Sequence, residues 1–179
     1  MNKIIIFLLI YFISLNSYAS EIKFEKIIRG LNSPWSLSFI DKENIIFTEK
    51  SGKLYLLSLK SKKISEIDHD LKVLDYGQGG LLDVLYSDEQ VYISYSEKRG
   101  NPDKKSDWSS STSVAKGKFN KENIKFKNIF RAEPPIDSMY HFGSRLVIKD
   151  KHLFISAGER GKGMIAQDAS KHPGSIIRI

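Results

Sequence analysis

The sequence of 179 residues contains no cysteine. This absence excludes a disulfide scaffold, a thiolate zinc site, an iron–sulfur cluster and a cysteine nucleophile. After residue 20 the sequence also lacks any extended segment in which apolar residues recur with a helical period. Short runs rich in β-branched and aromatic residues, separated by turn residues, take its place. The pattern predicts an all-β protein.

Composition limits the size and class of the fold. Hydrophobic residues make up 41% of the chain and charged residues 27%, which is typical of a globular protein with one core rather than several domains. The net charge is +7. Many lysines alternate with apolar residues, as in residues 124–127, and this alternation marks the solvent face of a strand. We therefore expect no nucleic-acid partner.

The first nineteen residues have the three parts of a secretory signal peptide. A basic Lys3 precedes an apolar run at residues 4–13, and small residues follow at Ser17 and Ala19. The apolar run is too short for a stable membrane span. The sequence predicts a signal peptide at 1–19, a domain at 20–179, a periplasmic or secreted location and no membrane span after cleavage. An uncleaved N-terminal anchor is the alternative, and the small residues disfavour it.

The β-rich runs fall into three sets. Each set starts with a hydrophobic run, and turn residues such as Ser51-Gly52 separate its members. The expected strands are 35–40, 44–48, 53–57 and 63–67 in the first set, 81–86, 90–94, 112–119 and 124–130 in the second, and 144–149, 152–156 and 175–179 in the third.

The sets are repeats of one another. Glu49, Glu97 and Glu159 each follow a small or hydroxyl residue, precede a basic residue and lie about fifteen residues after the start of their set. Four strands in roughly 45 residues is the blade of a β-propeller, and the chain supplies about the first three blades. We expect the repeated glutamates to share a turn-stabilising role. A β-sandwich would not explain the repeat, and a half-propeller that dimerises into a ring remains open.

Two polar residues lie where a propeller would present them to its central channel. His141 directly precedes the innermost strand of the third set, and an imidazole there suits a general base. Gln78, within Gly77-Gln78-Gly79-Gly80, has the equivalent place in the second set, and its amide suits a hydroxyl-rich ligand. The two are predicted to converge at one mouth of the channel. The alternatives are a histidine bonded to a neighbouring turn and a plain glycine turn.

Six motifs in order resemble a known family. They occupy residues 31–37, 77–84, 141–146, 158–161, 166–168 and 174–179. In this order they are similar to the soluble pyrroloquinoline quinone (PQQ)-dependent aldose sugar dehydrogenases of the glucose/sorbosone dehydrogenase group. The resemblance implies a six-bladed propeller in the periplasm, PQQ on the channel axis and calcium ions beside it.

The resemblance also implies roles for individual residues. His141 corresponds to the base that takes the proton from the C1 hydroxyl of an aldose while the hydride passes to PQQ and a lactone forms, and it also contacts the cofactor. Gln78 corresponds to a glutamine that lines the sugar site. Arg145 matches the arginine of the histidine motif, and we interpret it as structural. Tyr140 stands where the glucose dehydrogenases have aspartate, which favours the broader aldose branch and leaves the sugar open.

The resemblance further implies an electron acceptor, a quinone or a cytochrome. The remaining PQQ contacts and the calcium ligands are expected beyond Ile179, with no metal ligand in this chain. Two rival functions remain open. One is a non-catalytic propeller that binds carbohydrate or protein, and the other is a lactonase-type hydrolase, which would need a calcium-binding set of carboxylates and asparagines that these blades do not display.

Other candidate residues are interpreted as local structure. Asp68-His69-Asp70 is expected to be turn chemistry on a loop rather than a metal site. His152 is expected to be exposed at a hairpin turn, and His172 to lie in a loop. Trp108 is the aromatic residue that we expect to contact a surface partner or the substrate.

Overall fold

The computed structural model describes residues 22–101 and 107–179. The predicted signal peptide at 1–19 lies outside the described residues. Three sheets follow one another along the chain, in the orders β1-β2-β3-β4-β8, β10-β7-β6-β5 with β9 on β7, and β11-β12-β13. The strands are β1 Pro34–Phe39, β2 Asn44–Glu49, β3 Lys53–Ser58, β4 Ile64–His69, β5 Leu81–Ser87, β6 Gln90–Lys98, β7 Ser109–Lys118, β8 Asn123–Ile124, β9 Lys127–Arg131, β10 Ile136–Asp137, β11 Gly143–Lys149, β12 His152–Ala157 and β13 Ser175–Arg178, with a 3-10 helix η1 at Gly163–Gln167.

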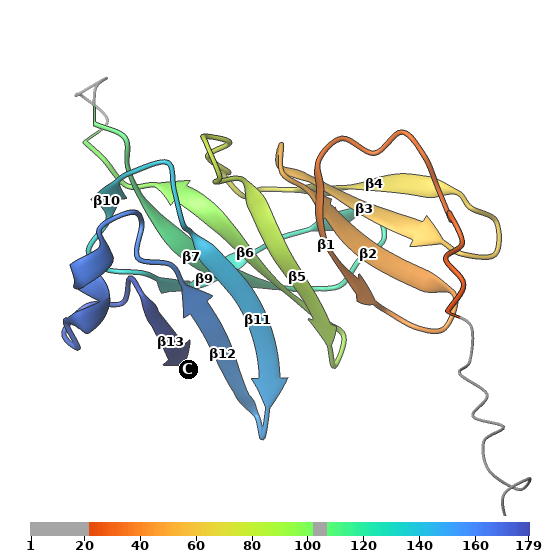
Figure 1. Ribbon diagram of the computed structural model, residues 1–179. Helices are drawn as coiled ribbons and strands as arrows, with labels where there is room; N and C mark the ends of the chain where they lie inside the picture. Colours follow the sequence, from red (N-terminus) through yellow and green to blue (C-terminus); the bar gives the residue numbers. More distant parts are fainter. Residues whose placement is uncertain (1–21, 102–106) are drawn as a thin grey trace, which may run out of the picture.

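The three sheets stand side by side, with the second between the first and the third (Figure 1). We call them blade 1 (β1–β4), blade 2 (β5–β7 and β9) and blade 3 (β11–β13). The first strand of each blade contacts the first strand of its neighbour, β1 against β5 and β5 against β11. Each of these inner strands also has a register irregularity near its start when it pairs with the next strand. The arrangement matches the predicted propeller blades.

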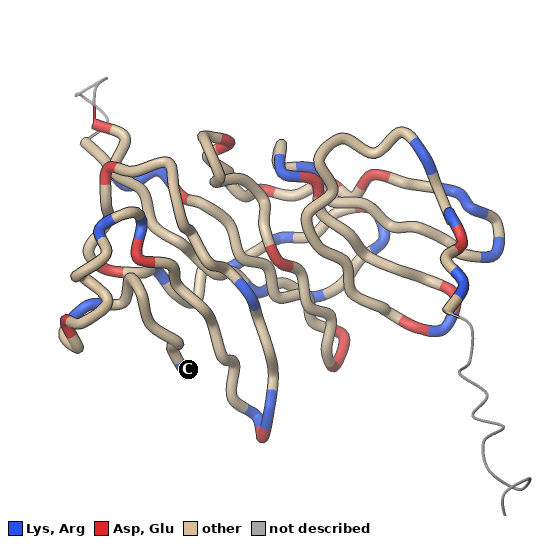
Figure 2. The backbone as a smooth tube through the Cα atoms, in the orientation of Figure 1, with Lys and Arg blue, Asp and Glu red and all other residues tan. Residues whose placement is uncertain are grey.

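Tight two-residue turns join the first two strands of blades 2 and 3. The β5–β6 hairpin turns at Asp88-Glu89 and the β11–β12 hairpin at Asp150-Lys151, with φ between 50° and 65° at all four residues. Two consecutive positive φ values give the type I′ turn that matches the twist of a two-residue hairpin. Such turns place charged residues at blade edges, and acidic and basic segments are interspersed there (Figure 2).

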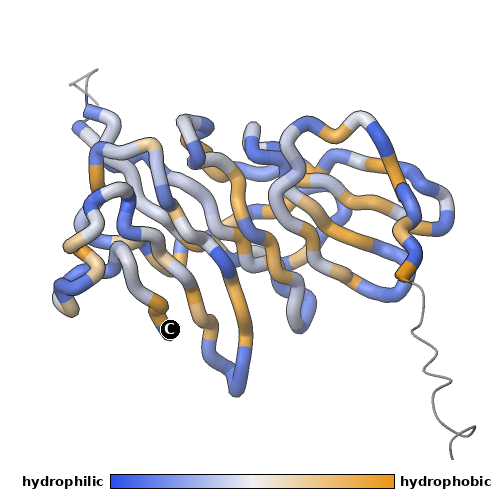
Figure 3. The backbone as a smooth tube through the Cα atoms, in the orientation of Figure 1, coloured by the Kyte–Doolittle hydropathy of each residue, from blue (hydrophilic) through white to orange (hydrophobic). Residues whose placement is uncertain are grey.

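The core lies between the blades. Ile46, Leu54 and Ile67 of blade 1 pack with Leu81 and Ile93 of blade 2, and all five side chains are almost fully buried. A second cluster joins Val114 of β7 to Leu146, Leu153 and Ile155 of blade 3. Hydrophobic stretches therefore follow the strands while the connecting turns are hydrophilic (Figure 3). Burial of both faces of a blade makes each blade depend on its neighbours.

The outer edge of blade 2 differs from the prediction. A continuous strand was expected at 124–130, but the chain forms β8, which pairs in parallel with β4 of blade 1, and then β9, which pairs with β7. Ile124 is fully buried, and the Phe126 N–H donates to Asp70 Oδ1 at 3.0 Å. Burial of this apolar side chain against blade 1 draws the segment away from its own sheet.

The same contact corrects the interpretation of residues 68–70. Asp68 and His69 are not on a loop, because β4 continues to His69 and pairs with β8. The His69 ring interacts through Nε2 with Gly52 O at 2.8 Å. These residues therefore join blade 1 to the crossing segment. Strand β7 also begins at Ser109, earlier than expected, because Ser109–Ser111 pair with β6 or β10.

The described part of the chain contains one short helix, η1. It lacks the length and apolar composition needed to cross a membrane.

Candidate functional site

Gln78 and His141 meet at the entry to the inner strands of blades 2 and 3. The His141 N–H donates to Gln78 Oε1 at 2.8 Å, and the Gln78 N–H donates to Met139 O at 2.8 Å. A side chain at Gly77, which has φ 59°, would collide with Met139. Glycine at 77 therefore permits the close approach of the two loops, and the structure places both predicted residues together.

His141 has an unusual backbone conformation. Its φ of 49° lies in the left-handed region, which costs a non-glycine residue about 1–3 kcal/mol. A Cβ on Gly158 would overlap His141 O, so the opposing strand end must be glycine. The surrounding contacts therefore hold His141 in a conformation that it would not adopt by itself.

The His141 imidazole is oriented by a carboxylate. His141 Nδ1 lies 2.5 Å from Glu159 Oε1, which also accepts the Gly161 N–H at 3.1 Å. An ionised carboxylate only accepts, so in the neutral imidazole Nδ1 has the proton and Nε2 has the lone pair. The hydrogen bond with His141 is the main cause that lowers the pKa of Glu159 below its ordinary 4.5. The His141 side chain is 52% exposed, so a ligand can reach its outer edge.

Arg160, next to Glu159, is buried beneath the His141 loop. It is 2% exposed, and its guanidinium lies 3.5 Å from the centre of the Phe142 ring. It donates to Tyr140 O at 2.8 Å, to Ser110 O at 2.9 Å, to Ser110 Oγ at 3.0 Å and to Ser138 O. Burial lowers the pKa of Arg160 to about 10. The sequence placed this residue in the repeat and in the motif at 158–161, but it was assigned no role.

Arg145 lies on β11 and pairs with a buried carboxylate. Its Nη1 is 3.3 Å from Asp83 Oδ1, while Asp83 Oδ2 accepts the Leu146 N–H at 2.7 Å. Asp83 also accepts a hydrogen bond from the Ser36 hydroxyl. One carboxylate thereby joins the inner strands of all three blades. The contacts support a structural interpretation of Arg145.

The three repeated glutamates do not share one role. Glu49 accepts the Asn32 N–H at 2.6 Å, and Glu97 accepts from Arg131 and Ser113. Glu159 instead binds His141. The expectation of a common turn-stabilising role is therefore wrong, because the residues facing the glutamates differ between blades.

Hairpin register could have identified Glu159 from the sequence. A two-residue turn at 150–151 pairs Lys149 with His152, and after a one-residue register shift between Leu146 and Gly143 the ladder ends at the pairing of Gly143 with Ala157. Continuing that register brings the residues just before β11 opposite those just after β12. Turn residues and β-rich runs predicted the strands, and the pairing register that follows from them was not used to find partners of His141.

The remaining aromatic and histidine candidates have local partners. Trp108 stacks on Tyr76, with ring centres 5.0 Å apart, and Lys98 Nζ lies 4.7 Å from the centre of the indole ring. His152 interacts through Nδ1 with Asp150 O at 2.9 Å and is exposed. His172 accepts the Glu133 N–H at Nδ1, as a loop residue.

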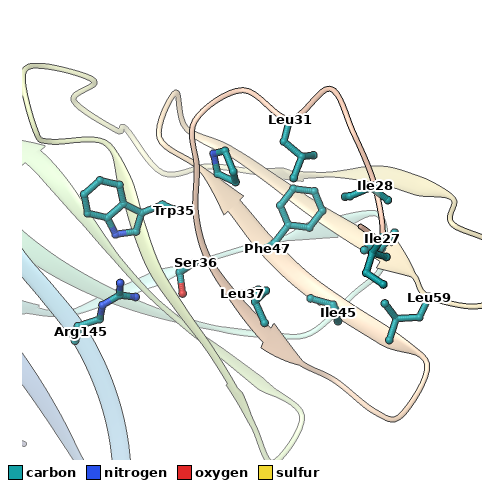
Figure 4. Close-up of a pocket in the computed structure, with 12 residues that line it drawn as sticks. Ile27, Ile28, Leu31, Trp35, Ser36, Leu37, Ile45, Phe47, Leu59 and Arg145 are labelled. Carbon is teal, nitrogen blue, oxygen red and sulfur yellow. The ribbon is translucent and has the colours of Figure 1, made fainter. Parts of the chain in front are cut away.

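A cavity of about 550 Å³ lies apart from His141, on blade 1 (Figure 4). Its walls are mostly apolar side chains of β1–β3 and of the segment before β1, with Arg145 and Ser36 at one edge. Leu37 and Phe39 on β1 are more than half exposed. The cavity contains no acid–base pair and is part of the apolar outer face of blade 1.

Comparison with known proteins identifies the family. The family model described as Glucose / Sorbosone dehydrogenase matches residues 31–179. The chain belongs to the glucose/sorbosone dehydrogenase family. Aldose sugar dehydrogenase YliI of Escherichia coli (strain K12) is 31% identical over 159 residues, which are 83% of this chain and 41% of that protein.

Solved structures confirm the fold of this family member. A glucose dehydrogenase crystal structure matches with a TM-score of 0.78 and 31% identity, over 87% of this chain and 46% of that one. The PQQ-bound form of an aldose sugar dehydrogenase from Streptomyces coelicolor matches with a TM-score of 0.72 and 23% identity, over 87% and 46%, and shows the shared fold. The chain spans somewhat less than half the length of these relatives.

The described residues of this glucose/sorbosone dehydrogenase family member fit part of a quinone site. His141 offers an exposed imidazole edge, and the 51% exposed Tyr140 ring lies beside it, with ring centres 6.1 Å apart. Residues 22–101 and 107–179 contain no group of three or more His, Asp or Glu side chains placed to hold a metal.

Proposed function

We propose that the complete protein is a PQQ-dependent aldose sugar dehydrogenase that oxidises the C1 hydroxyl of aldoses to lactones. The observation that carries the proposal is the His141–Glu159 hydrogen bond beside Gln78 in a chain of this family. Bases for alcohol oxidation need an accessible lone pair and a fixed orientation. His141 supplies the accessible lone pair on Nε2, and its hydrogen bond with Glu159 fixes the orientation of the ring.

His141 is the proposed general base. With Nδ1–H directed at Glu159, Nε2 takes the proton from the C1 hydroxyl, and Glu159 stabilises the imidazolium that forms. Bound PQQ supplies the quinone that accepts the hydride from C1. The positive charge that His141 acquires is compensated by the adjacent carboxylate, so proton removal requires no large rearrangement.

Gln78 is the proposed sugar-binding residue. Its Oε1 accepts the His141 N–H, and this fixes the orientation of the amide. The two hydrogens on Nε2 are then available to sugar hydroxyls. Gln78 would thus position the aldose and the base with one side chain.

Cofactors, acceptor and location complete the proposal. PQQ enters through the motif resemblance, and the relative from Streptomyces coelicolor, whose fold this chain shares, was solved with PQQ bound. The calcium ligands and the further PQQ contacts belong to the part of the protein beyond Ile179, and a quinone or a cytochrome takes up the electrons. The signal-peptide pattern at 1–19 supports a periplasmic or secreted location.

Replacement of His141 tests the base. In the complete PQQ-loaded protein, we expect His141→Ala to lower kcat by at least about 10²-fold with an aldose and an artificial electron acceptor. Circular dichroism should stay unchanged, because the side chain is half exposed. His152→Ala is the matched control, since it removes another exposed imidazole at the β11–β12 turn.

The outcomes separate the proposal from its rival. A His141→Ala enzyme with near-normal kcat contradicts the base assignment. Absence of oxidation of every aldose tested by the wild-type protein, together with unchanged PQQ absorbance, favours the non-catalytic carbohydrate- or protein-binding propeller.

A further inference from the structure

Arg160 is a buried cation without a carboxylate partner among its hydrogen bonds in the described residues. Its acceptors are the carbonyl oxygens of Ser138, Tyr140 and Ser110 and the Ser110 hydroxyl. Burial of a charge against neutral groups is costly and is a poor way to gain stability. We therefore ask which part of the structure the hydrogen bonds of Arg160 hold in place.

The acceptors of Arg160 define the loop that contains His141. Ser138 O and Tyr140 O lie on the segment between β10 and β11, and Ser110 lies on β7 of blade 2. The Arg160 N–H also donates to His141 O at 3.3 Å. Arg160 therefore contacts the loop at three places. It binds residues that precede His141, it binds His141 itself, and its guanidinium lies against the ring of Phe142.

The loop needs such support because its conformation is unfavourable. His141 has φ 49°, and its N–H and O are directed at Gln78 and Arg160 respectively. A planar guanidinium with a fixed set of donors can bind several oxygens at once, which an ammonium cannot do. Arg160 thereby fixes the backbone from which the imidazole projects.

We propose that Arg160 is a positioning residue for the His141 base, acting through the 138–142 loop rather than on the substrate. The inference rests on the proposed function. It also assigns adjacent tasks in one motif: Glu159 orients the imidazole ring and Arg160 holds the backbone that bears it.

The test compares Arg160→Lys with wild type in the complete PQQ-loaded protein. Lysine keeps the positive charge but cannot bind the several carbonyl oxygens that the planar guanidinium binds at once. We therefore expect kcat to fall at least tenfold while KM for the aldose stays within about twofold. Hydrogen exchange of residues 138–142 should accelerate at least tenfold, while exchange of β12 stays unchanged. Arg131→Lys is the matched control, because Arg131 pairs with Glu97 away from this loop, and it should alter neither readout.

A milder variant covers the possibility that Arg160→Lys does not fold. Ser110→Ala removes one acceptor of the guanidinium, the hydroxyl oxygen, and leaves the others in place. It should give a smaller change of the same kind, with faster exchange at 138–142 and lower kcat.

Two results overturn the proposal. One is unchanged kcat and exchange in Arg160→Lys, and the other is acceleration that extends equally to β12, which would show a general stabilising role. If the wild-type protein oxidises no aldose, the proposed function fails, whereas the exchange measurement still decides whether Arg160 holds the loop.

Discussion

The turn after β2 in blade 1 and the turn after β12 in blade 3 use the same backbone frame. The Lys50 N–H donates to Ser33 O at 3.0 Å, and the Arg160 N–H donates to His141 O at 3.3 Å. Both acceptors precede an inner strand and have nearly equal φ, 52° at Ser33 and 49° at His141. His141 therefore occupies a place that blade 1 fills with a serine.

The two turns differ in which charge is buried. In blade 1, Glu49 is 5% exposed and binds a backbone N–H, while Lys50 extends to the exposed Asp75. In blade 3, Arg160 is buried and Glu159 is partly exposed beside the imidazole. The backbone geometry of the turn is thus the same in both blades, but the acidic residue is buried in blade 1 and the basic residue is buried in blade 3. A structural turn becomes a candidate site when its carboxylate faces solvent and a histidine.

Among the changes that test this comparison of the two turns, loss of the Glu159 charge should have the largest effect on kcat. In the complete PQQ-loaded protein, we expect Glu159→Gln to lower kcat by about 10²-fold or more, because the amide no longer favours the Nδ1–H tautomer or stabilises imidazolium. Unfolding stability should change little, because the side chain is partly exposed. Steady-state kinetics with an aldose measures the effect. Near-wild-type kcat would show that Glu159 does not orient the base.

The matching change in blade 1 should act on stability instead. Glu49→Leu removes the acceptor of the Asn32 N–H and should lower the free energy of unfolding by about 1–3 kcal/mol. Denaturant unfolding measures the loss, and Glu49→Gln, which retains an acceptor oxygen, should lose less. A kcat defect like that of Glu159→Gln, in a protein of normal stability, would contradict the contrast between the two turns.

The sequence predicted the features that local chemistry determines. Alternating apolar residues and turn residues predicted the inner hairpins, as at Asp88-Glu89 and Asp150-Lys151, where each turn begins with an aspartate, a residue that tolerates positive φ. The equivalent places of Gln78 and His141 in successive repeats predicted their convergence, since equivalent positions of neighbouring blades lie at the same end.

Features that depend on long-range packing were not predictable in this way. The outer strand of blade 2 is divided because Ile124 is buried against blade 1, a contact between segments far apart in sequence. The roles of Glu159 and Arg160 depend on which residues face them across the hairpin, and the repeat alone makes them look like Glu49 and Lys50. Periodicity reports that positions are equivalent, whereas their function depends on the partners.

Titration of Glu159 gives the smallest and most local test of the contrast. Its pKa is lowered chiefly by the His141 hydrogen bond, so in His141→Ala the carboxyl should titrate closer to its ordinary 4.5, as followed by carbon-13 NMR. A depressed pKa in the folded state stabilises the protein above the unfolded pKa, and this stabilisation is lost as pH falls through the folded value. The wild type should thus lose more stability than His141→Ala on acidification below about pH 4.5.

Glu97 serves as the reference carboxyl for this titration. Burial raises its pKa, but hydrogen bonds from Arg131 and Ser113 outweigh burial and lower it. None of these contacts depends on His141. An unchanged Glu159 midpoint in His141→Ala would mean that the imidazole does not bind this carboxylate in solution, and the blade 3 turn would then be structural like that of blade 1.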